Sequence, residues 1–140
     1  MLADSHCHLD WFNGPKDVIE RAVKEEVGSV FSCSTNLLSM KKHLLFRGLP
    51  QVKIALGIHP VDLLKIPSGQ IGESIAFLQE NVSLVQGIGE IGLDYKYALT
   101  EKDRFLQEKI FVKQVEIALE NGLPIVVHSR FSEAKSMSLL

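Results

Sequence analysis

The feature that most constrains the fold of this chain is an alternation of short strand-like apolar runs with segments of helical periodicity. The apolar runs cover residues 1–6, 29–33, 53–58, 84–94 and 123–128. Helical patterns cover residues 13–28, 37–48, 72–80 and 100–122, and a further one begins within 132–140. Strands that are apolar throughout and separated by helices are typical of a parallel sheet with helices packed against it. The sequence therefore predicts an α/β fold.

Two parallel architectures fit this alternation, the doubly wound open sheet and the TIM (β/α)8 barrel. Both place their chemistry at the carboxyl ends of the strands. Imidazole and carboxylate side chains lie at or just after four of the predicted strands: His6, His8, His59, Glu90 and His128. Polar groups gathered from so many strands favour the barrel, because its active site draws on many strand ends.

The length of the chain bears on how much of a barrel it can form. A TIM barrel has eight strands and usually about 250 residues, whereas this chain has 140 residues. We therefore expect residues 1–140 to form one partial TIM-barrel domain, truncated after about five βα units. An open sheet of this kind would leave unpaired strand edges.

Composition limits the classes of partner and compartment. A net charge of −2 does not indicate a basic surface for nucleic acid, so a polyanionic substrate would need local positive charge or metal. No apolar run is long enough to span a membrane, and the first residues lack the pattern of a signal peptide. We therefore expect a cytoplasmic protein in which Cys7 and Cys33 are reduced thiols. No pattern indicates an oligomeric state.

The stretch "ADSHCHLDW" places His6 and His8 two residues apart as the chain leaves its first predicted strand. Strand residues two apart point to the same side, so both imidazoles can hold one cation while Cys7 points away. The alternative is a pair of polar loop residues with no ligand, because His-x-His also arises by chance.

The segment "GIGEIGLDYKY" carries Glu90 and Asp94 within an apolar, glycine-rich strand end. A carboxylate in such surroundings is costly unless it is paired or binds a cation. Glycines at a strand end also indicate close approach of the backbone to another group. The structural alternative is a glutamate in an ion pair at the end of a sheet.

The remaining candidates are weaker when taken singly. His59 precedes a proline and suits a turn, His128 follows a buried strand and suits a core, and Arg130 can hold phosphate or carboxylate. Together with the first two histidines and Glu90, they indicate one metal site. Imidazole and carboxylate ligands suit zinc, manganese or iron, and carboxylates with water suit magnesium. A glutamate bridging two cations would form the two-metal arrangement used in phosphoester hydrolysis.

Four ordered motifs carry a family resemblance: "DSHCHLD", "GIHP", "GEIGLDY" and "PIVVHSR", which extend from residue 4 to residue 130. At these spacings the chain resembles the TatD family of metal-dependent deoxyribonucleases, which belongs to the amidohydrolase-like metal hydrolases built on a TIM barrel. One departure is Lys96, where the family often has tyrosine.

The resemblance implies a role for each matching position. It implies two divalent ions (Mg²⁺, Mn²⁺ or Zn²⁺), DNA as the substrate, and a metal-activated water as the nucleophile. His6 and His8 would bind the first ion, His128 the second, and Glu90 would bridge them as the catalytic residue. The substrate phosphates would contact His59 and Arg130, and Asp94 would support the site.

Two other functions stay open at this point. The family pattern continues with a further histidine and an aspartate on later strands, which would fall beyond Leu140. The chain would then be a catalytically incomplete remnant or binding module with a partial metal site. A hydrolase acting on a small amide is the third interpretation, since the same ligands serve that chemistry.

Overall fold

A computed structural model describes all residues from 1 to 140, and its centre is one sheet of five parallel strands. The strands follow one another across the sheet in chain order, β1-β2-β3-β4-β5, and every neighbouring pair is parallel. Their bounds are β1 (Leu2–Cys7), β2 (Val27–Cys33), β3 (Val52–Leu56), β4 (Gly87–Asp94) and β5 (Ile125–Arg130). A doubly wound sheet reverses its strand order at a switch point. The sequential order therefore excludes that alternative and confirms the barrel-type fold.

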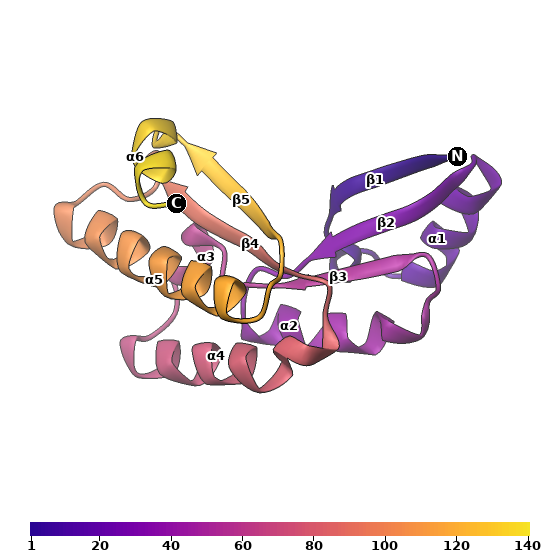
Figure 1. Cartoon of the computed structure of the whole chain (residues 1–140), viewed down its shortest axis with the longest axis horizontal. Helices are drawn as coiled ribbons and strands as arrows, with labels where there is room; N and C mark the ends of the chain where they lie inside the picture. Colours follow the sequence, from indigo (N-terminus) through magenta and orange to yellow (C-terminus); the bar gives the residue numbers. More distant parts are fainter.

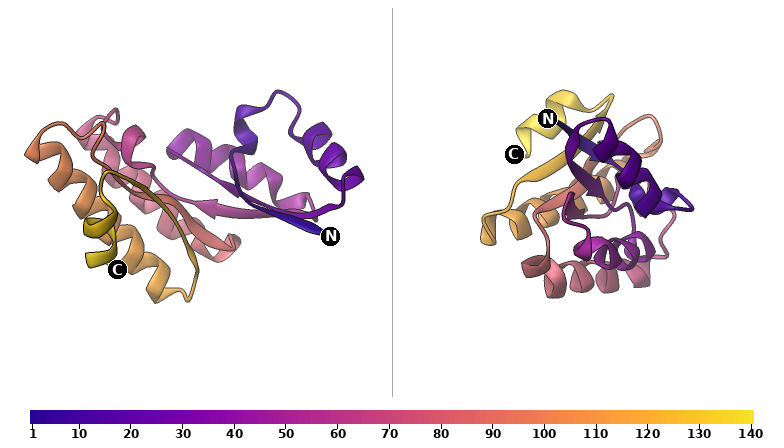
Figure 2. Two further views of the ribbon diagram at one scale, coloured as in Figure 1. Left: turned by 90° about the horizontal axis from the view of Figure 1, so that it is seen from above. Right: turned by 90° about the vertical axis from the view of Figure 1, so that its right-hand side faces the viewer.

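Helices connect the strands and lie outside the curved sheet. They are α1 (Pro15–Lys24), α2 (Leu37–Leu44), α3 (Pro60–Leu63), α4 (Ser68–Asn81), α5 (Glu101–Glu120) and α6 (Glu133–Ser138), with 3₁₀ turns η1 (Leu9–Trp11), η2 (Leu45–Gly48) and η3 (Val82–Leu84). Figure 1 shows α2, α4 and α5 together on one side of the strands. Figure 2 shows the indigo β1 and the yellow end of the chain at opposite ends of the curled sheet, which forms about half of a barrel. None of the helices combines the length and the apolar character that crossing a membrane requires.

Strand β4, next to the edge strand β5, is buried along its whole length, and α5 packs along it. The apolar side of α5 contributes Phe111 and Ile117 to the core. Two buried glutamines of the same helix reach the strand ends. Gln114 exchanges hydrogen bonds with the backbone of Ile58, while Gln107 accepts from the Asp94 N–H and donates to the Pro60 carbonyl. These bonds fix the chain on both sides of His59 and at the end of β4.

The first helix ends earlier than the sequence predicts. Helix α1 stops at Lys24, and Val27 and Gly28, which the periodicity places in the helix, begin β2. Between them Glu26 adopts the left-handed conformation with φ of 63°, which reverses the chain direction. Its carbonyl accepts from the Leu2 N–H, so pairing with β1 outweighs helical periodicity here.

The other bounds agree with the sequence to within a few residues. Helix α5 begins with a capping box, since Thr100 and Asp103 exchange hydrogen bonds. Strand β5 continues to Arg130, which places His128 inside the strand. The one-turn helix α3 directly after His59 is absent from the sequence prediction.

Gly92 allows β5 to lie close to β4. Its φ is 143°, a conformation that residues with a Cβ rarely adopt, and a Cβ added there would overlap the carbonyl oxygen of His128. The two residues are direct partners in the ladder. The glycine therefore sets the spacing between two strands that carry candidate site residues.

We expect Gly92→Ala to lower the free energy of unfolding by more than about 1 kcal/mol, because the methyl group forces the strands apart. The matched control is Gly72→Ala. Gly72 lies inside α4 with open space around it, so alanine there should stabilise the protein by about 0.5–1 kcal/mol. Urea denaturation measures both changes, and equal effects of the two substitutions would contradict the close approach at Gly92.

Candidate metal centre

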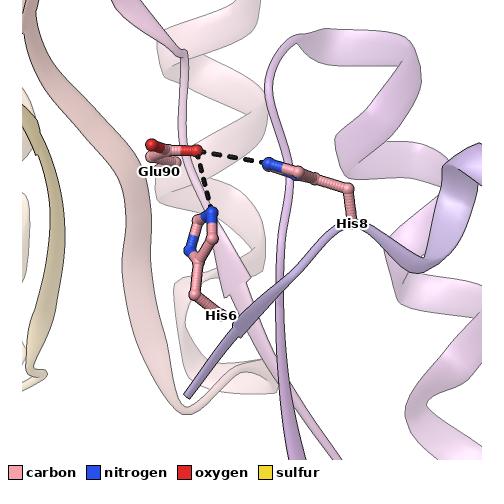
Figure 3. A group of neighbouring side chains, drawn as sticks. All are labelled: His6, His8 and Glu90. Carbon is pink, nitrogen blue, oxygen red and sulfur yellow. Dashed lines mark ion pairs between the residues drawn. The ribbon is translucent and has the colours of Figure 1, made fainter. Parts of the chain in front are cut away.

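Glu90 lies at the middle of the candidate site. It projects from β4, follows a cis peptide bond at Gly89–Glu90, and is 8% exposed. One of its carboxylate oxygens, Oε2, lies 3.2 Å from Nε2 of His6 and 3.3 Å from Nε2 of His8 (Figure 3). His6 belongs to β1 and His8 directly follows it, so the two predicted histidines do point at a common atom.

The other oxygen of Glu90 faces a second group of imidazoles. Oε1 lies 3.1 Å from Nδ1 of His128 on β5 and 3.8 Å from Nε2 of His59 after β3. Within each group, one nitrogen from each histidine and one Glu90 oxygen lie within 4.8 Å of one another. The carboxylate therefore stands between two separate sets of nitrogen donors, with one oxygen for each.

Hydrogen bonds assign the ring protons of two histidines. His8 donates from Nδ1 to the Cys33 carbonyl at 2.8 Å, which leaves Nε2 as the ring nitrogen that faces Glu90. His128 lies 2.9 Å through Nε2 from Oδ2 of Asp94, so donation there leaves Nδ1 facing Glu90. A carbonyl or carboxylate behind an imidazole is the usual support of a metal-binding histidine.

His59 has the opposite arrangement. It precedes α3, and its Nδ1 accepts the backbone N–H of Val61 at 3.2 Å. A neutral imidazole that accepts through Nδ1 carries its proton on Nε2. The nitrogen that faces Glu90 is therefore a hydrogen-bond donor and has no free lone pair for a cation.

The charges of the site follow from these contacts. Burial raises the pKa of Glu90, but hydrogen bonds from His128 and His8 outweigh it and hold that pKa far below the ordinary range. Burial alone would lower the pKa of His8, but its hydrogen bond to Glu90, together with its other contacts, has the larger opposite effect, so the pKa of His8 is raised. The pKa of His128 is raised by its contact with Glu90, while burial lowers that of His59. Glu90 is consequently an anion at neutral pH.

The donor set fits divalent cations. Two ligand atoms about 2.1 Å from one ion and at a tetrahedral angle are about 3.4 Å apart. The contacts of Glu90 with His6, His8 and His128 span 3.1 to 3.3 Å, close to that separation. Imidazole nitrogens with one carboxylate are typical of zinc, manganese and iron sites.

Asp94 and Arg130 complete the predicted set. Asp94 is 1% exposed, and its Oδ1 accepts the N–H groups of Lys96 and Tyr97 in the turn after β4. The guanidinium of Arg130 makes no ion pair or hydrogen bond within the chain and lines an open hollow of about 300 Å³. The hollow lies over the strand ends, and its lining is His8, Trp11, Thr35, His59, Val61, Asp62, Lys65, Asp94, Tyr97, His128 and Arg130.

Sequence reasoning missed a buried polar group beneath the first pair of histidines. His43 of α2 is fully buried, donates from Nδ1 to the Ser39 carbonyl, and accepts from Ser32 through Nε2 at 2.8 Å. The Ser32 hydroxyl in turn accepts the Leu9 N–H, which holds the chain just after His8. Oδ1 of Asp10 is buried without a hydrogen-bond partner, 3.9 Å from His43. A histidine in a helical segment outside the motifs gave no signal of this role.

The curled parallel sheet and the imidazole–carboxylate cluster at its strand ends define a TIM-barrel-type protein with a candidate metal site. Comparison with known proteins gives the family. The model of the family described as TatD related DNase matches residues 3–140, so the chain belongs to this family. The family relationship confirms the resemblance seen in the four motifs.

Individual relatives agree with this assignment. The chain is 36% identical over 135 residues to the metal-dependent hydrolase MJ1582 of Methanocaldococcus jannaschii, covering 94% of this chain and 52% of the relative. It is 29% identical over 153 residues to human deoxyribonuclease TATDN3, covering 99% and 56%. The crystal structure of the TatD homologue YJJV from Escherichia coli superposes with a TM-score of 0.83 at 26% identity, over 98% of this chain and 54% of that one. The chain thus spans about half the length of these relatives.

The buried His43 allows a prediction for the pH dependence of stability. Burial lowers its pKa below the ordinary value of about 6.5. The unfolded chain therefore binds a proton more readily, and the contribution of His43 is present above that pH and is lost as the pH falls below it. The free energy of unfolding of wild type, relative to His43→Gln, should decrease between pH 7.5 and pH 5.

Urea denaturation of both proteins across that range measures the difference. Contributions from all other groups are common to both proteins and cancel when His43→Gln leaves the site intact. A difference that stays constant with pH would contradict a neutral, buried His43.

Proposed function

We propose that this protein is a metal-dependent phosphodiesterase that hydrolyses DNA. The observation that carries the proposal is the placement of Glu90, whose two carboxylate oxygens face two different sets of imidazole nitrogens. The arrangement corresponds to a carboxylate that bridges two cations. Divalent ions bound there would supply an activated water and stabilise the negative charge that develops on the phosphate oxygens.

The chain's own residues divide into ligands and supports. His6, His8 and Glu90 would hold one ion, and Glu90 with Nδ1 of His128 would hold the other. Asp94 keeps the imidazole of His128 oriented through its Nε2. Glu90 is the proposed catalytic residue, because it belongs to both candidate ligand groups and would be a ligand of both ions.

His59 and Arg130 are the proposed phosphate contacts. The proton on Nε2 of His59 points into the site and can be donated to a phosphate oxygen. The guanidinium of Arg130 is free of internal partners and can bind an anion in a bidentate manner. Such local donors are needed because the chain as a whole carries a net charge of −2. The choice of DNA as substrate is supported by the family and by relatives named as deoxyribonucleases.

Glu90→Gln should lower metal-dependent cleavage of DNA by at least about 100-fold and weaken metal binding, because the neutral amide removes the shared anionic ligand. The substitution keeps the size of the side chain, so the circular dichroism spectrum should be unchanged. The matched control is Glu73→Gln on the exposed side of α4, which should keep the wild-type rate. Cleavage of a labelled oligonucleotide with Mg²⁺ or Mn²⁺ measures both, and wild-type activity of Glu90→Gln would refute the bridging role.

A second candidate function is metal binding without turnover. It is favoured by the donor count, since the Nε2 proton of His59 leaves only Glu90 and His128 as ligands for the second ion within this chain. Catalytic zinc sites usually have three protein ligands. This protein would then bind one ion firmly at His6, His8 and Glu90 and hold the second weakly.

Calorimetric titration with Zn²⁺ or Mn²⁺ tests this distribution of ligands. We expect two binding events of unequal affinity in the wild type. His6→Ala should abolish the tighter event, because that ion loses one of three protein ligands, and His128→Ala should abolish only the weaker one. Loss of the tighter event in His128→Ala would contradict the ligand assignment.

A further inference from the structure

The only tryptophan of the chain stands exposed beside the metal centre. Trp11 lies in η1, three residues after His8, and is 69% exposed. Its ring is stacked on the imidazole of His8 with 4.3 Å between the ring centres and 20° between the planes. The indole therefore holds a fixed orientation while most of its surface faces solvent.

A second aromatic side chain lines the same hollow. Tyr97 follows β4 and is 50% exposed, and both aromatic residues border the hollow that contains His59, His128 and Arg130. Trp11 and Tyr97 thus come from the loops after two strands that are not neighbours in the sheet. Large aromatic surfaces left in water beside a polar site are typical of a surface that contacts a ligand.

We propose that Trp11 stacks on a nucleobase of the bound strand, next to the phosphate held at the metal centre, and that Tyr97 is a second base contact. The inference rests on the proposed function and adds to it the residues that recognise the base. The hollow combines hydrogen-bond donors for an anion with exposed aromatic rings. A nucleotide likewise combines a phosphate with a flat ring. Stacking on an aromatic side chain is tolerant of base identity, because every base has a π face.

A purely structural role for Trp11 predicts different behaviour. If the indole only supports the imidazole of His8, its removal would weaken metal binding and would affect every strand equally, with or without bases. If it stacks on a base, its removal would matter only for strands that carry bases. A comparison of normal and abasic oligonucleotides separates the two roles.

The experiment measures fluorescence anisotropy of a short labelled oligothymidylate and of an abasic strand of the same length, in Mn²⁺ buffer. Phosphorothioate linkages slow hydrolysis during the measurement. The wild type should bind the base-bearing strand at least about fivefold more tightly than the abasic strand. Trp11→Ala should remove most of this preference and Tyr97→Ala part of it, while affinity for the abasic strand stays the same.

Phe12→Ala is the matched control. Phe12 is the neighbouring aromatic residue, is 50% exposed and does not line the hollow, so its removal should leave the preference intact. Because Trp11 is the only tryptophan, its emission gives an independent signal, which the base-bearing strand should quench and the abasic strand should not. Metal titration of Trp11→Ala checks that the site at His8 still forms.

The outcomes separate this inference from the proposed function. Equal binding of both strands by the wild type, or equal losses for both strands in Trp11→Ala, would overturn the base contact and leave phosphodiester hydrolysis untouched. A base preference that depends on Trp11, in a protein that cleaves no DNA, would support the base contact and contradict the proposed reaction.

Discussion

The contact between one buried carboxylate and imidazoles from distant strands determines the rest of this structure. In a flat sheet β1 and β4 would be about 14 Å apart, at three strand spacings of about 4.8 Å. His6 and Glu90, which belong to these strands, nevertheless lie 3.2 Å apart at their side-chain ends. Only a strongly curled sheet brings them together across its inner side, as Figure 1 shows for the arc from β1 to β5. A buried carboxylate without partners would be costly, so the imidazoles also stabilise the strand that carries it. The curvature of the sheet and the charge balance of the site therefore depend on the same contacts.

The same contacts show which protons a bound cation would replace. The pKa of His8 and that of His128 are raised because each faces the anionic Glu90. A cation bound between these groups would take the place of the protons, since metal ligands must be deprotonated. The carbonyl behind His8 and the carboxylate behind His128 remain in place in either state and keep both rings directed at Glu90. The supporting hydrogen bonds thus hold both rings in orientations that are compatible with cation binding.

Much of the fold could be predicted from the sequence because it depends on local patterns. Apolar runs and helical periodicity located all five strands, and the spread of polar residues over strand ends distinguished the barrel from the open sheet. The errors arose where contacts between distant segments outweigh periodicity. Val27 and Gly28 continue a helical pattern, yet the left-handed Glu26 and pairing with β1 place them in a strand. His43 shows the same limit at the site, because its role depends on Ser32, which lies on a separate strand.

His59 and His128 differ in what fixes the position of the ring proton. For His59 it is a contact with the next residues of the chain, and for His128 it is a contact between two strands. Pro60 occupies the first position of α3 and has no N–H, so the N–H of Val61 is the one that the ring before the helix can accept. The hydrogen bond from the Val61 N–H therefore places the proton of His59 on Nε2. For His128 no residue nearby in the sequence fixes the position of the ring proton. The hydrogen bond to Asp94 on the adjacent strand β4 places the proton of His128 on Nε2. This contact requires the register between β4 and β5, which Gly92 permits. The orientation of His59 thus depends on a contact within three consecutive residues, whereas that of His128 depends on the register of the sheet.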